Sequence, residues 1–238
     1  MGCSFCVNLV PVDKEVKEIL QTLDKNYEKL EENFVVKAKD IEDKRNKQLE
    51  NRRKKLQELK DKNQEITKEI LEDLNKKESD MENKILVGEI EKMHSIYELG
   101  LDLTEPMKEY SIKKLEKKLT SVPSAMVNKI NEEINEIKKL KPIEFLKSTY
   151  GKALQDALAK KGMSKTILVK FRKDMVKERK SRREKEKEEF NIKVELKEED
   201  DDFDIDLFSL VEDEVNGEEF QQNCEKKLLK MLGGSKSK

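Results

Sequence analysis

Hydrophobic residues recur at helical spacing through the first third of the chain. No Gly or Pro lies between Val12 and Val87, so this stretch lacks the residues that most strongly break helices. Apolar positions that alternate three and four residues apart form the heptad seam of a coiled coil. The pattern predicts a long coiled-coil region over residues 13–99, with this seam: Val16, Leu20, Leu23, Tyr27, Leu30, Phe34 and Ile41, then Leu56, Leu59, Asn63, Ile66 and Ile70.

Two readings of this region stay open. Residues 42–55 contain one apolar residue, Leu49, and are interpreted either as a solvated helix face or as the point where the helix folds back. A single long helix would expose its apolar stripe, so it either pairs with another chain, as a homo- or hetero-oligomer, or folds into a hairpin. Asn63 at a seam position either fixes the register or lies in a turn.

Glycine and proline residues divide the remainder of the chain into shorter segments. Gly100 is placed to end the long region, and prolines mark the starts of shorter helices. The predicted fold class is all-α: a long N-terminal coiled-coil helix or helical hairpin, a small helical bundle, a charged helix, and an acidic, largely disordered tail with a short C-terminal helix. The expected segments are an N-terminal arm over 1–12, helices over 105–119, 124–140 and 142–161 in a bundle over 104–162, the charged helix over 164–196, and the tail over 197–238.

The composition favours a fold of helices that each bury one apolar stripe, rather than a fold with a thick globular core. Charged residues make up 43% of the chain and hydrophobic residues 35%, with a mean hydropathy of -0.89. No apolar run is long enough to predict a transmembrane helix. Carboxylates are abundant, but the pattern places none of them in a pocket, no Gly-rich phosphate loop occurs, and His94 is the one histidine. We therefore expect a protein that is not an enzyme, with no cofactor and no metal site.

The net charge of the whole chain is close to zero, but its middle is basic and its tail is acidic. Residues 165–187 hold 11 Lys and Arg against 4 Asp and Glu, which predicts binding to an anionic surface. Nucleic acid is the less favoured ligand, because aromatic residues interleaved with basic ones are missing. A solvated helix held by i,i+4 pairs is the structural alternative. The candidate residues are Lys165, Lys170, Arg172, Lys173, Lys177, Arg179, Lys180, Arg182 and Arg183.

The acidic tail combines carboxylates with apolar residues. Phe208, Leu210 and Val211 resemble a short docking peptide that adds to a protein partner, whereas the alternative is an ordinary solubilising tail. Opposite charges in one chain suggest a third role. The tail would fold back and compete with whatever the basic helix binds.

The chain opens MGCSFC, which places Gly2 after the initiator and two cysteines, Cys3 and Cys6, close behind. This start resembles the dually acylated amino termini of some Src-family kinases and G-protein α subunits. The resemblance implies myristate on Gly2 and palmitate on Cys3 and Cys6, although position 6 of the myristoylation pattern is Ser or Thr. The alternatives are reduced cysteines on a packed arm, or a metal or redox pair.

Together these features predict a lipid-anchored scaffold or adaptor on the cytoplasmic face of a membrane, with unidentified protein partners. The first alternative is a nucleic-acid or ribonucleoprotein factor that uses residues 165–187, with nuclear localisation. Size, helical content and basic-then-acidic order also resemble the ESCRT-III polymer family, which implies membrane remodelling as a second alternative. That family has a basic first hairpin, whereas residues 1–100 here hold 20 basic and 23 acidic side chains.

Overall fold

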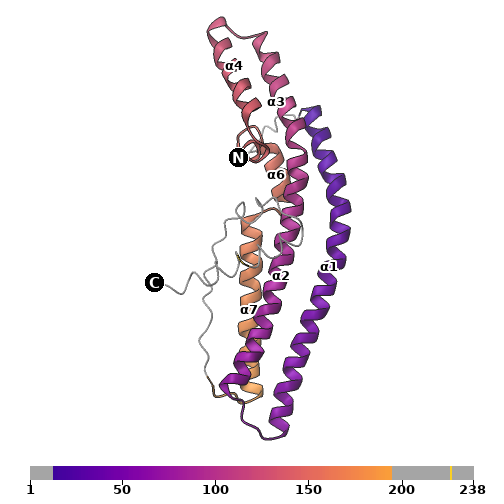
Figure 1. The fold of residues 1–238 in the computed structure, drawn as a ribbon, viewed down its shortest axis with the longest axis vertical. Helices are drawn as coiled ribbons and strands as arrows, with labels where there is room; N and C mark the ends of the chain where they lie inside the picture. Colours follow the sequence, from indigo (N-terminus) through magenta and orange to yellow (C-terminus); the bar gives the residue numbers. More distant parts are fainter. Residues whose placement is uncertain (1–12, 195–225, 227–238) are drawn as a thin grey trace, which may run out of the picture. The chain divides into compact units, whose positions relative to one another are not determined.

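The computed structural model describes residues 13–194 and residue 226. The predictions for the N-terminal acylation sites, the acidic tail and the short C-terminal helix lie outside these described residues. Within them every regular element is a helix and no strand occurs, which confirms the all-α fold of a long N-terminal helix followed by smaller ones. Figure 1 shows the helices: α1 Lys14–Asp61, α2 Lys68–Asp102, α3 Thr104–Leu119, α4 Ser124–Lys139, α5 Pro142–Lys147, α6 Lys152–Lys160 and α7 Lys165–Glu189.

A turn over residues 62–67 joins α1 to α2, so the long region contains a helical hairpin. Asn63 has a φ of 53°, in the left-handed region that asparagine tolerates better than most residues. Its N–H donates to the Lys60 carbonyl at 3.0 Å, and the Gln64 N–H donates to the Leu59 carbonyl at 2.9 Å. These two bonds close α1 as a Schellman motif. Asn63 therefore lies in a turn, which is one of its two expected roles.

The chain divides into two compact units, each assembled from distant segments. The first unit contains Met1–Glu31 and Ile96–Gly162, and the second contains Glu32–Ser95 and Met163–Lys238. Because α1 and α2 each cross a boundary, they contribute residues to both units. The hairpin turn and α7 belong to the second unit.

The first unit holds α3 to α6 together with the start of α1 and the end of α2. α3 and α4 pack against each other across a short turn. Gly100 lets α2 approach α6, since a Cβ there would lie 2.5 Å from Leu158 Cδ1. The start of α1 is held by Asp13, whose Oδ2 accepts from the Tyr110 hydroxyl at 3.1 Å.

Residues 142–161 form two helices where the sequence predicts one. α5 ends when the Ser148 N–H and Oγ both donate to the Phe145 carbonyl, at 3.0 and 2.7 Å. The chain then turns so tightly that a Cβ on Gly151 would lie 2.3 Å from that same carbonyl oxygen. Only glycine fits this approach, so the backbone breaks here without the proline that usually signals a break.

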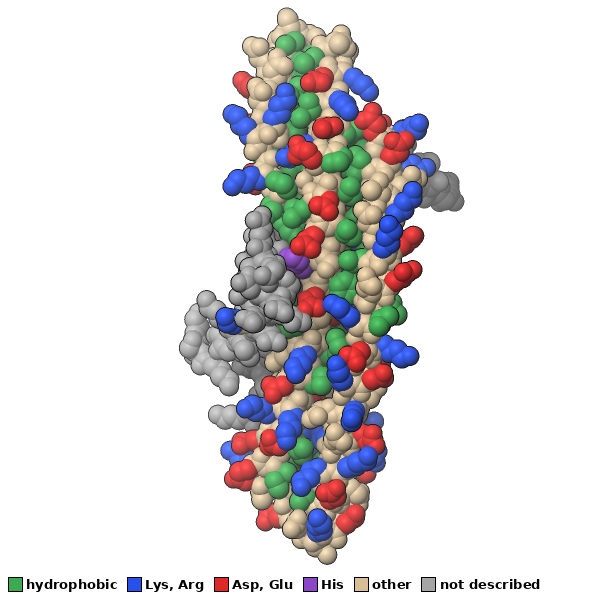
Figure 2. Space-filling view, turned by 45° about the vertical axis from the view of Figure 1, so that its right-hand side comes forward, with side chains coloured by type: hydrophobic (Ala, Val, Ile, Leu, Met, Phe, Trp, Pro, Cys, Tyr) green, Lys and Arg blue, Asp and Glu red, His purple; other side chains and the backbone are tan. Residues whose placement is uncertain are grey.

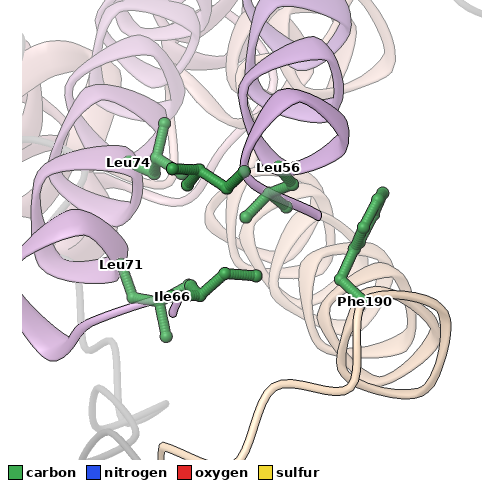
Figure 3. Packing of buried hydrophobic residues seen from close by; sticks show 6 residues of the cluster. Leu56, Ile66, Leu71, Leu74 and Phe190 are labelled. Carbon is green, nitrogen blue, oxygen red and sulfur yellow. The ribbon is translucent and has the colours of Figure 1, made fainter. Parts of the chain in front are cut away.

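An apolar cluster closes the hairpin end of the second unit. Leu56 and Leu59 come from α1, Leu71 and Leu74 from α2, and Phe190 from the end of α7. Figure 3 shows Leu74 and Leu56 side by side, with Phe190 at the end of α7 on the other side of Leu56. Leu56 is fully buried, and the cluster also includes Ile66. This cluster joins the end of α7 to the hairpin.

We predict that Leu56→Ala lowers the free energy of unfolding by about 2–5 kcal/mol, because it removes buried methyl groups and leaves a cavity. Val36→Ala is the control, since Val36 is 70% exposed on the same helix and its loss is expected to change stability by less than about 0.5 kcal/mol. Urea unfolding followed by circular dichroism measures both. Equal losses in the two variants would contradict the assignment of Leu56 to the core.

Candidate functional site

The seam of α7 continues through charged residues. Leu168, Arg172, Met175, Arg179, Arg182 and Glu186 are spaced 4, 3, 4, 3 and 4, the same pattern as an apolar heptad. Arg172, Arg179 and Glu186 are only 6%, 3% and 8% exposed. The sequence suggests that the apolar face ends after Met175. The structure instead keeps the same face inward and fills it with guanidinium and carboxylate groups.

α1 and α2 supply matching charges. Residues 42–55 remain helical, and Arg52 occupies the seam between Leu49 and Leu56 with 4% exposure. Glu78 and Glu82 lie four residues apart on α2 and are 4% and 3% exposed. Sequence reasoning missed these three residues because it read the seam from apolar residues alone. The signal for Arg52 is its position three residues after Leu49 and four before Leu56, which continues the heptad spacing.

Glu82 forms ion pairs with two arginines of α7. Its Oε2 accepts from Arg179 Nη1 at 2.6 Å and lies 3.4 Å from Arg172 Nη1. All three side chains are at least nine-tenths buried, so each charge depends on the others for the solvation that water would supply.

A second group of charges lies nearer the hairpin turn. Arg52 Nε donates to Glu186 Oε2 at 2.8 Å, which links α1 to α7. Glu78 Oε2 lies 3.7 Å from Arg52 Nη1 and accepts from Arg183 Nη2 at 3.1 Å, while Arg182 contacts Glu78 Oε1. The Arg52 Nη1 also donates to Asn75 Oδ1 at 3.0 Å. α1, α2 and α7 therefore meet in one hydrogen-bonded ionic network.

Burial has a cost at Arg182. Desolvation, together with the smaller effect of the nearby cations Arg52, Arg183 and Arg45, lowers the pKa of its guanidinium to about 10. The carboxylate of Glu186 opposes this shift. Arg182 remains charged at neutral pH, and Glu78 and Glu186 are the partners that make its burial tolerable.

The nine basic residues predicted to face an anionic surface thus separate into two groups. Arg172 and Arg179 are buried against Glu82, and Arg182 and Arg183 are half-buried against Glu78, so these four do not form the expected outer face. Lys165, Lys170, Lys173 and Lys177 are exposed, and Lys180 is half-buried. A shallow groove of about 460 Å³ on this side of α7 is lined by Arg172, Lys173, Val176, Lys177, Lys180, Ser181 and Glu184.

An apolar groove of about 330 Å³ lies elsewhere in the second unit. Phe34, Ala38 and Ile41 line it from α1, Ile85 and Gly88 from α2, and Phe171 from α7. A Cβ on Gly88 would lie 3.4 Å from Ile41 Cδ1, so the two helices approach closely here. Val35, at the groove, and its neighbour Val36 are 63% and 70% exposed.

The residues of the predicted coiled-coil seam mostly face inward. Figure 2 shows side chains of both charges interspersed with hydrophobic ones on one face of the molecule, as expected where helices bury single stripes. Asn63 is exposed in its turn. The other seam positions are buried at Val16, Leu23, Leu56, Leu59 and Ile66, and half-buried at Leu20, Tyr27, Leu30, Phe34, Ile41 and Ile70.

No helix among the described residues is both long enough and apolar enough to cross a membrane. In the same part of the chain, no three side chains of the His, Cys, Asp and Glu types gather as metal ligands would. Comparison with protein-family models, curated proteins and solved structures finds no match to the chain.

We predict that Arg52→Met lowers the free energy of unfolding by about 3–5 kcal/mol, because it leaves Glu78 and Glu186 buried with less compensating charge. The neighbouring Arg53 provides the control. It pairs with Glu189 at 2.7 Å but is 68% exposed, so Arg53→Met is expected to cost no more than about 1 kcal/mol. Chemical unfolding of both variants measures the difference. Equal, small losses would show that the network does not hold the helices together.

Proposed function

We propose that the protein is a lipid-anchored, non-enzymatic helical scaffold on the cytoplasmic face of a membrane. Acyl groups on Gly2, Cys3 and Cys6 attach it to the bilayer, and the outer lysines of α7 contact anionic lipid headgroups. The helical units then carry surfaces for protein partners. Nucleic acid, the other polyanion that such lysines attract, is the competing ligand.

The sorting of basic residues on α7 is the observation that supports this proposal most. Its inward arginines match carboxylates with several planar N–H donors, which suits a buried ion pair. Its outer cations are lysines, whose flexible stems carry a hydrated charge to a surface without a fixed geometry. Lys173 and Lys177 lie one turn apart on the groove side, and each basic residue near an anionic leaflet contributes about 1 kcal/mol of attraction.

The amino-terminal sequence supplies the stronger part of the attachment. One myristoyl chain gives only marginal, reversible binding, so stable anchoring requires a second signal. Two cysteines within six residues of the start offer thioester sites for that signal. The lysines of α7 then add an electrostatic contribution that depends on lipid charge and on salt.

We predict that Gly2→Ala shifts the protein from the membrane pellet to the supernatant in eukaryotic cells, because alanine at this position cannot accept myristate. Ser4→Ala is the matched control, since it changes a neighbouring residue without removing an acylation site, and it should pellet like the wild type. Fractionation followed by immunoblotting measures the distribution. If wild type and Gly2→Ala pellet equally, or if neither pellets, the lipid anchor is wrong.

A further inference from the structure

We propose that the acidic run Glu198–Asp202 of this chain docks back onto the lysine-lined groove of α7. The occupant is thus the protein's own tail, and the ligand chemistry is a row of carboxylates. The docked tail neutralises the face that would otherwise meet anionic lipid. The regulation of lipid binding by the docked tail rests on the proposed function, whereas the contact between tail and groove does not.

The groove has the properties that an acidic peptide requires. Lys173, Lys177 and Lys180 follow one side of α7, and Val176 lies between them. Cations spaced by three and four residues form a continuous row along a helix, and here Lys173 and Lys177 are exposed and Lys180 is half-buried. Such a row binds a flexible acidic segment through several weak ion pairs acting together.

α7 ends in a left-handed turn beside the apolar cluster at the hairpin end. α7 closes with the Asn191 N–H donating to the Glu188 carbonyl at 3.4 Å and the Ile192 N–H donating to the Lys187 carbonyl at 3.0 Å. Asn191 has a φ of 51°, so α7 ends in the same left-handed motif as α1. Ile192 and Val194 then pack against the apolar cluster that contains Leu71 and Leu74 of α2. The described part of the tail therefore ends beside the apolar cluster, at the hairpin end of the second unit.

The length of the tail matches the position of the lysines. From Phe190 back to Lys180 is about 15 Å along α7, and back to Lys173 is about 26 Å, at about 1.5 Å per residue. An extended chain covers about 3.3 Å per residue, so a stretch of about five to eight residues after Val194, which packs in the same cluster as Phe190, is long enough to reach these lysines. Those positions are residues 199–202, inside the uninterrupted run of five acids.

Charge favours this occupant over other segments of the chain. Residues 165–187 hold 11 basic and 4 acidic side chains, whereas residues 197–238 hold 6 basic and 13 acidic ones. Tethering also raises the effective concentration of the tail to the millimolar range, which no free acidic peptide matches in a cell.

Disulfide trapping in the full chain tests the contact. Cys3, Cys6 and Cys224 are replaced by Ser, and Asp201→Cys is combined with either Lys177→Cys or Glu178→Cys. Positions 177 and 178 are both exposed neighbours on α7 but point about 100° apart. We expect the 177–201 pair to form an intramolecular disulfide about tenfold faster than the 178–201 pair, and high salt to remove the difference. Equal rates at low salt, with circular dichroism showing both variants folded, would overturn the docking.

Vesicle binding tests what the docking controls. The quartet Glu199→Gln, Asp200→Asn, Asp201→Asn and Asp202→Asn is compared with a control quartet of the same net charge, Glu212→Gln, Asp213→Asn, Glu214→Gln and Glu218→Gln. We expect the first quartet to bind phosphatidylserine vesicles about tenfold more tightly than the second. A trapped disulfide with equal vesicle binding would leave the docking standing and contradict the lipid contact. Tighter binding of the first quartet to duplex DNA alone would assign the face to nucleic acid.

Discussion

The second unit depends on the burial of arginine and glutamate at positions where helices normally bury leucine. Glu82 lies between Arg172 and Arg179, and Arg52 reaches from α1 to Glu186 of α7. A buried charge without its partner costs several kcal/mol, so each helix is stable against the others only in the register that completes these pairs. The apolar cluster at the hairpin end and other buried side chains such as Leu86 and Ile90 supply burial energy, and the ionic network favours one arrangement of the helices.

Much of the fold could be predicted from the sequence because helix periodicity and punctuation are local. The long seam, the absence of Gly and Pro over 76 residues, and the caps near residues 104, 124 and 165 give the all-α architecture. The position of the hairpin turn could not be predicted from the sequence, because asparagine at position 63 suits both a polar seam position and a left-handed turn. The break before Gly151 was equally hidden, because it depends on a close approach to the Phe145 carbonyl that only the folded chain reveals.

The candidate site shows where reading hydrophobicity alone fails. Eleven basic residues in one helix suggest a uniform polyanion-binding face, yet the structure turns several arginines inward onto Glu78 and Glu82 and leaves the lysines outside. Heptad spacing carries this information irrespective of residue type. The lysines that remain outside form a narrower basic surface than the nine predicted residues would. Their attraction to an anionic ligand is weak and additive, so an acyl anchor can supplement it and a tethered acidic tail can oppose it.

A double-mutant cycle between Glu82 and Arg179 tests the central claim that buried ion pairs hold α7 to the hairpin. The free energy of unfolding is measured for the wild type, Glu82→Gln, Arg179→Met and the double variant. If the pair is buried and mutually dependent, each single change is costly and the double change costs less than their sum, with a coupling energy of about 2 kcal/mol or more. Additive effects, within about 0.5 kcal/mol, would contradict the account.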